Sequence, residues 1–192
     1  MDHRNYLTLI RSPRLTSTTR DVLLQRAAPS SFEYVPQLFS REDFSTLGAL
    51  LARLIPQKKD AEFVDLAAVL DTRKATGAGQ GWRYAWLPPD AIAITLGLGL
   101  LQVTARRLHG ADFTYLDEAQ KDDLLRQVQD GRLAWAELDG QRWFENLLAE
   151  ATEIYVSQPA TLAAMGFSGI AFLPHWPQIG LNTAQAWEPV AG

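Results

Sequence analysis

The sequence predicts an all-α protein, a single-domain bundle of about five to seven helices followed by an irregular C-terminal tail rich in aromatic residues and proline. Apolar residues recur at three- and four-residue spacing in successive segments, as on one face of a helix. Several of these segments begin at a capping side chain. The 192 residues are 47% apolar and 21% charged, which is the composition of a globular domain with a core.

We expect three parts along the chain: an N-terminal extension at 1–37, a helical domain at 38–165 and a tail at 166–192. The extension holds one short helix, which begins after Ser17 or Thr18 and ends before Pro29. Residues 1–15 are mostly polar, so we expect a frayed terminus there. No internal repeat is present.

The helical domain is predicted to open at Ser40, an N-cap candidate followed three residues later by Asp43. Phe39 and Phe44 stand at the two positions of a hydrophobic staple. An apolar row follows and ends before Pro56, comprising Phe44, Leu47, Leu51 and Leu54. A second helix is expected to begin at Asp60, with its apolar side formed by Phe63, Leu66, Ala67 and Leu70.

Residues 91–109 fit two interpretations. Apolar residues alternate with small ones over 91–100, which is the period of a strand. The apolar stretch continues beyond strand length, however, and ends in a basic cluster before Gly110, as a helix C-terminus does. We favour a buried central helix that begins at Asp90, in which Gly97 and Gly99 permit close packing.

Three more helices follow in the sequence. Asp117 and Gln120 form a capping box, and Gly131 ends the helix that it opens. A long amphipathic helix is expected over 141–157, and a short one over 160–165. The apolar face of the long helix comprises Phe144, Leu147, Leu148, Ala151, Ile154 and Tyr155.

Charge and cysteine content exclude several functions. A net charge of −4 argues against nucleic-acid binding, and the absence of cysteine excludes disulfides, thiolate metal sites and cysteine nucleophiles. Residues 1–30 are basic by count (+3) and residues 112–150 acidic (−6). The acidic stretch predicts a solvated face on two helices, with an acidic docking surface as the alternative.

No catalytic, cofactor-binding or metal-ligating residue is predicted. The histidines His3, His109 and His175 have no sequence partner for catalysis, and His109 is explained by its place at a helix end. The glycines of 77–81 lack the preceding strand of a dinucleotide site, so they indicate a flexible connection. The acidic pairs on helices, which we expect to be solvated, are Glu150 with Glu153 and Asp122 with Asp123.

Neither membrane insertion nor export is expected from the sequence. The apolar run at 91–101 is shorter than the roughly 20 residues that a spanning helix needs. The first thirty residues contain no apolar signal core and no twin-arginine pair. We therefore expect a soluble, cytoplasmic chain, which becomes periplasmic only if a signal-bearing partner carries it.

A series of short motifs resembles the gluconate 2-dehydrogenase subunit 3 family over roughly residues 38–175. The central motif reads Gly97-Leu98-x-x-Leu101, then His109-Gly110-x-x-Phe113-x-x-Leu116, then Gln120 and Leu124-Leu125. The opening motif reads Phe44-x-x-Leu47-x-x-Leu50-x-x-x-Leu54-Ile55-Pro56. The closing motif reads Tyr155-x-x-x-Pro159 and Met165-Gly166-Phe167-x-Gly169.

The resemblance implies a non-catalytic accessory role. Members of the family are small helical subunits that support the folding of a large flavoprotein dehydrogenase of the glucose–methanol–choline class. That large subunit holds FAD and the catalytic residues, and electrons leave through a cytochrome c subunit. The resemblance therefore implies no cofactor in this chain and FAD in its partner.

The tail is the predicted docking segment for that partner. It carries large aromatic residues and a single charged residue, a composition typical of interface centres. The docking residues that we predict are Phe167, Phe172, Trp176 and Trp187. In the alternative, the tail covers the chain's own helices. Two other functions stay open: a stand-alone enzyme or ligand-binding protein whose pocket uses the aromatics of 82–86 and 172–176, and a free-standing helical binding module.

Overall fold

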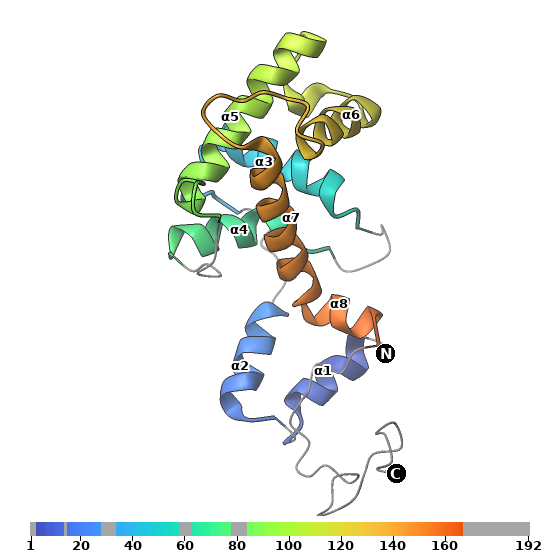
Figure 1. The fold of residues 1–192 in the computed structure, drawn as a ribbon. Helices are drawn as coiled ribbons and strands as arrows, with labels where there is room; N and C mark the ends of the chain where they lie inside the picture. The colour runs from blue at the N-terminus through green and yellow to red at the C-terminus, as the bar shows by residue number, and fades with distance from the viewer. Residues whose placement is uncertain (1–2, 14, 28–33, 58–62, 78–83, 167–192) are drawn as a thin grey trace, which may run out of the picture. The chain divides into compact units, whose positions relative to one another are not determined.

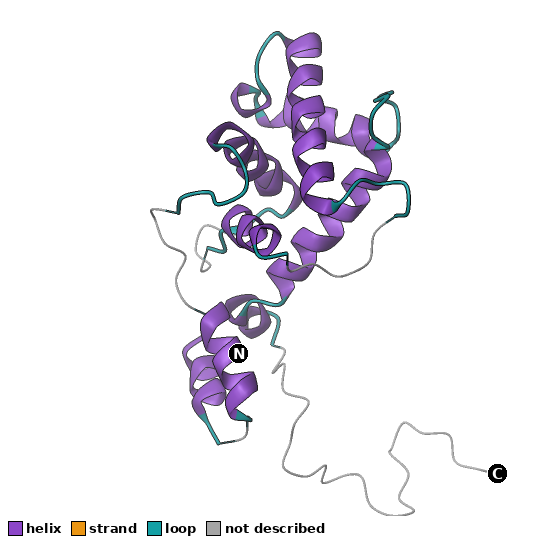
Figure 2. Cartoon of the chain, turned by 90° about the vertical axis from the view of Figure 1, so that its left-hand side faces the viewer, coloured by secondary structure: helices purple, strands orange, loops and turns teal. Residues whose placement is uncertain are grey.

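A computed structural model describes residues 3–13, 15–27, 34–57, 63–77 and 84–166. These residues form helices and no strand, so the all-α prediction is confirmed for them (Figures 1 and 2). The helices are α1 (His3–Arg11), α2 (Ser17–Arg26), α3 (Arg41–Leu54), α4 (Leu66–Ala75), α5 (Asp90–His109), a 3₁₀ turn η1 (Phe113–Tyr115), α6 (Glu118–Gln129), α7 (Gly140–Val156) and α8 (Pro159–Ala164). The described residues contain eight α-helices, where the sequence predicted about five to seven; α1 is the helix that was not expected.

The chain divides into two compact units, where the sequence predicted a single domain. The smaller unit comprises residues 1–28 and 159–192, and the larger comprises 29–158. In the smaller unit α1 packs against α2 and α8. Helix α1 was not predicted, because its fully buried residues Tyr6 and Ile10 are few and obtain part of their cover from Ala163, far along the chain.

The larger unit is built around three helices that contact one another, α3, α5 and α7. Helix α4 packs on α3 and α7, and α6 packs on the same two helices (Figure 1). The fully buried leucines at the centre are Leu47, Leu50, Leu70, Leu98, Leu101 and Leu124. This unit therefore holds the main core of the described chain.

Several helix ends lie at the capping residues that the sequence predicted. Ser40 Oγ accepts the Asp43 N–H at 3.0 Å at the start of α3. Asp117 and Gln120 form the reciprocal capping box of α6. Helix α5 ends at Gly110, whose φ of 73° is left-handed and favours glycine.

Helix α4 begins later than the sequence predicted. Its N-cap is Asp65, which accepts the Ala68 N–H at 3.0 Å, whereas Asp60 lies outside the described residues. The side chain of Gln57 exchanges two 2.8 Å hydrogen bonds with the backbone N–H and C=O of Val64. These bonds occupy the backbone before the helix, so Phe63 lies outside it and is 68% exposed.

The central segment forms the helix that we favoured, but its two glycines have different surroundings. A Cβ added to Gly97 would lie 2.2 Å from Cε2 of the buried Trp143 indole, so only glycine fits there. A Cβ added to Gly99 would meet nothing within 4 Å. The expectation of close packing is confirmed for Gly97 and wrong for Gly99 within the described structure.

Asp71 on α4 joins the segment before α3 to the core. Its fully buried carboxylate accepts the backbone N–H groups of Gln37, Leu38 and Phe39 at 2.6, 3.1 and 2.9 Å. It also accepts the hydroxyl of Tyr34 at 2.6 Å. Burial alone raises the pKa of this carboxyl, but the four hydrogen bonds outweigh burial and hold the pKa below its ordinary value of 3.8.

Asp71→Asn is expected to destabilise the chain by about 3 kcal/mol, because an amide NH₂ cannot accept the buried N–H groups. Because the pKa of Asp71 is lower in the folded state, its carboxylate stabilises the fold at pH values above the unfolded-state pKa. That stability is lost as pH falls through the folded-state pKa. Urea unfolding between neutral pH and pH ~3 should therefore show a smaller acid loss for the variant than for the wild type. Asp123→Asn, at an exposed position on α6, is the control; an equal loss in both would contradict this role of Asp71.

Candidate functional site

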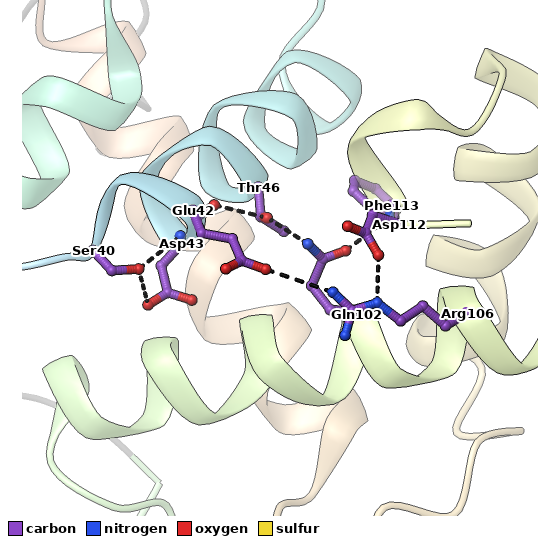
Figure 3. Close-up of polar contacts among 8 residues, drawn as sticks. All are labelled: Ser40, Glu42, Asp43, Thr46, Gln102, Arg106, Asp112 and Phe113. Carbon is purple, nitrogen blue, oxygen red and sulfur yellow. Dashed lines mark hydrogen bonds and ion pairs between the residues drawn. The ribbon is translucent and has the colours of Figure 1, made fainter. Parts of the chain in front are cut away.

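A buried amide links α3, α5 and η1 in the larger unit. Gln102 on α5 donates through Nε2 to Thr46 Oγ1 at 3.1 Å, and its Oε1 accepts the Phe113 N–H at 2.7 Å (Figure 3). Thr46 donates in turn to the Glu42 carbonyl at 3.0 Å. Each polar atom of the Gln102 amide thus has a partner within the fold, so the arrangement positions helices and leaves no group for chemistry.

An exposed ion cluster lies beside this amide. Arg106 on α5 pairs with Asp112 and approaches Glu42 at 3.6 Å (Figure 3). The hydrogen bond and charge of Arg106 hold the pKa of the Asp112 carboxyl below its usual value. The cluster ties the end of α5 to the turn that follows it, and surface pairs of this kind are worth about 1 kcal/mol or less.

Gln102→Leu is expected to destabilise the chain by about 1–3 kcal/mol, because it leaves the buried Phe113 N–H without an acceptor. The matched control is Gln127→Leu, which removes only an exposed hydrogen bond to Asp123 and should cost about 0.5 kcal/mol or less. Chemical unfolding measures both variants. Equal stability of the two would show that the amide bridge is unimportant.

A buried lysine joins α4, α5 and α7. Lys74 is 4% exposed at its side chain, and its Nζ lies 2.8 Å from Asp90 Oδ2 and 2.8 Å from Glu150 Oε1. Burial raises the pKa of the Glu150 carboxyl, against the opposing effect of Lys74. The prediction that Glu150 is solvated is therefore wrong, because its partner Lys74 lies far away in the sequence and gave no local signal.

Many acidic residues of the stretch 112–150 have partners within the fold. Asp117 and Asp139 cap helices. Other acids of the stretch form ion pairs with basic side chains, namely Asp112, Glu118, Asp122, Asp130, Glu145 and Glu150. Because Asp122 and Glu118 both pair with Arg53, they stabilise the contact between α3 and α6.

An aromatic platform lies beside the N-terminal end of α7. Trp86, 69% exposed, stacks on Tyr84 with ring centroids 6.3 Å apart. The Tyr84 hydroxyl donates to Glu145 at 2.9 Å, and the Arg142 guanidinium lies 4.8 Å from the centre of its ring. Tyr84 and Trp86 belong to the aromatic segments 82–86 and 172–176 that were considered as a pocket. The other aromatic residues of those segments, Trp82 among them, lie outside the described residues.

Most of the histidines and all of the docking residues named from the sequence lie outside the described residues. His109 is the last residue of α5, as expected, and the side chain of His3 and all of His175 lie outside the described residues. The proposed docking residues also lie outside them: Phe167, Phe172, Trp176 and Trp187. Among the residues that the structure describes, no group of three or more His, Asp or Glu side chains is placed to hold a metal ion.

A family model for gluconate 2-dehydrogenase subunit 3 matches residues 41–174. The chain belongs to the gluconate 2-dehydrogenase subunit 3 family. The match begins at the first residue of α3 and includes every helix from there to α8. No curated relative and no solved structure matches the chain.

Membership of the gluconate 2-dehydrogenase subunit 3 family makes the chain a relative of a subunit in a multi-subunit dehydrogenase, which implies a partner subunit. The buried polar groups described above agree with such a role, because Gln102, Lys74 and Asp71 all serve the fold.

Proposed function

We propose that the chain is a non-catalytic small subunit, which binds a large FAD-dependent dehydrogenase of the glucose–methanol–choline class and supports its folding and assembly. One observation carries the proposal, the family match over α3 to α8. It is supported by the use of the buried polar side chains within the fold. The buried carboxylates Asp71 and Glu150 are both engaged by donors or a cation, as structural groups are.

The proposal places the redox cofactor in the partner. FAD and the residues that react with substrate belong to the large subunit, and a cytochrome c subunit accepts the electrons. This chain then contributes surface rather than chemistry. The aromatic residues of the tail, which lie outside the described residues, remain predicted contacts with the partner.

Purification of the tagged full chain from its native host tests the proposal. We expect a large subunit to co-purify, to be identified by mass spectrometry as a flavoprotein of that class, and to carry all the flavin of the preparation. The same chain expressed alone should be colourless. Flavin bound in equal amount to the isolated chain, or purification without any dehydrogenase, would contradict the proposal.

A further inference from the structure

Helix α5 is more apolar than its own core contacts require. By length and composition it would pass as a membrane-spanning helix, yet only 44% of its most apolar 18-residue window is buried. A soluble helix normally keeps its apolar residues to the buried side. In Figure 1, α5 runs from the left of the larger unit up to its top, and Figure 2 shows the molecule from that left-hand side.

Four residues of α5 form an outward row. Ile92, Leu96, Gly99 and Val103 follow one another at spacings of four, three and four residues, which places them on one face of the helix. Ile92 is 57% and Val103 is 60% exposed, and Leu96 is half-buried. Leu96 also packs against the core, and the exposed Thr95 lies beside the row. The opposite face carries Leu98 and Leu101, which are fully buried in the core.

Gly99 lies at the centre of this outward row and, having no side chain, leaves the helix backbone uncovered there. Nothing in the described structure lies within 4 Å of the position that its Cβ would occupy. Glycine in the interior of an exposed helix is unfavourable relative to alanine. Its presence here fits a second backbone that approaches α5 closely at this point, since a side chain would hold that backbone away.

Two arginines, Arg106 and Arg107, stand at the C-terminal end of the row. The acidic residues near its ends already have basic partners: Asp90 pairs with Lys74, and Asp112 and Glu42 lie against Arg106. From residue 91 to Gly110, α5 and its cap contain no acidic residue. Arg106 already pairs with Asp112, whereas Arg107 is exposed and has no ion pair among the described residues. A complementary surface is therefore apolar along its length and acidic at one end.

We propose that the outward row of α5 (Ile92, Leu96, Gly99 and Val103) is the docking surface for a helix of the large dehydrogenase subunit, with an apolar row along it and a carboxylate facing Arg107. This inference rests on the proposed function and specifies its interface. Heptad-like spacing on α5 is the pattern that receives a partner helix. The central glycine allows the two helices to approach closely.

Charge disfavours a second copy of this chain as the occupant. In an antiparallel pair centred on Gly99, Ile92 of each copy would face Arg106 of the other, since both lie seven residues from the centre. A parallel pair would bring the arginines of both copies together, and like charges repel.

The test uses the full chain and the purified large subunit identified by the co-purification above, with the dissociation constant measured by titration. Val103→Glu should weaken binding at least about tenfold, with an unchanged melting temperature, because residue 103 contacts little of its own chain. Gly99→Ala should raise the melting temperature by about 2–4 °C and still weaken binding about tenfold.

Gly48→Ala provides the matched control for Gly99→Ala. Gly48 lies within α3, and its Cβ position is also open. We expect a similar rise in melting temperature with no change in binding. Wild-type affinity in both Gly99→Ala and Val103→Glu, with the wild-type complex intact, would overturn the docking surface and leave the proposed function standing. Failure of the wild type to bind would overturn both.

The alternative occupants give separate outcomes. Light scattering reports whether the wild type alone is a dimer that Val103→Glu dissociates, and co-sedimentation reports binding to vesicles of phosphatidylethanolamine and phosphatidylglycerol. We expect a monomer that does not sediment with vesicles. A dimer or a vesicle complex lost in Val103→Glu, while the large subunit still binds with full affinity, would overturn the proposal.

Discussion

Lys74→Met is expected to destabilise the chain by about 3–5 kcal/mol, because it leaves Asp90 and Glu150 without their shared cation. Glu150 bears most of this loss, since its residue is 4% exposed and Lys74 is its ion-pair partner. Urea unfolding at neutral pH measures the effect. Stability within about 1 kcal/mol of the wild type would show that the buried pair is dispensable.

The same variant should change the dependence of stability on pH. Burial raises the folded-state pKa of Glu150, so this residue contributes favourably to stability at pH values below its unfolded-state pKa. That contribution is lost as pH rises through its folded-state pKa. Removal of Lys74 raises that pKa further, so the variant should lose stability as pH increases above about 4.5. Addition of Glu150→Gln should remove most of this pH-dependent loss.

Lys74 itself acts in the alkaline range. Burial alone lowers its pKa, but the hydrogen bonds and charges of Asp90 and Glu150 outweigh burial and raise it above 10.5. The stability that Lys74 contributes is therefore fully present below its unfolded-state pKa. It is lost as pH rises through its folded-state pKa. Arg73→Met is the matched control for Lys74→Met, because the neighbouring Arg73 makes only a partly exposed ion pair with Glu153 at 3.3 Å. We expect it to destabilise the chain much less than Lys74→Met does.

Gly97→Ala is expected to destabilise the chain by about 3 kcal/mol or more, because the new Cβ would lie 2.2 Å from the Trp143 ring. The indole cannot move away easily, since it is 2% exposed and packs edge-on against Trp135 with ring centroids 5.7 Å apart. Thermal unfolding measures the effect. A second substitution, Trp143→Leu, should restore part of the loss if the clash is its cause.

Gly99→Ala serves as the internal reference for this prediction. Both glycines lie in the middle of α5, and only the surroundings of their Cβ positions differ. Alanine at 99 should stabilise the chain by about 1 kcal/mol. Equal losses at the two positions would mean that backbone propensity, rather than the contact with Trp143, decides both.

Local chemistry made much of the fold predictable. Ser40, Asp117 and Gly110 act through neighbours three or four residues away, so their caps can be recognised in the sequence. The helical state of α5 followed from its length and its basic C-terminal end, although its alternating pattern resembled a strand. These elements depend on short-range interactions, which a single sequence displays directly.

Distant contacts account for what the sequence could not show. The burial of Glu150 depends on Lys74, and the helix at the N-terminus depends on cover from α8. The different surroundings of Gly97 and Gly99 follow from which side of α5 faces Trp143. For the same reason the outward row of α5 could not be predicted, because the sequence of an apolar helix does not show which of its faces stays exposed.

The partition of activity between the subunits tests the accessory role most directly. The purified complex is separated into its subunits, and each is assayed for flavin content and for substrate-dependent reduction of an artificial electron acceptor. The account predicts that flavin and turnover stay with the large subunit and that this chain alone has neither. Flavin or turnover that follows this chain, or turnover abolished by substitution of one of its side chains with the complex intact, would contradict it.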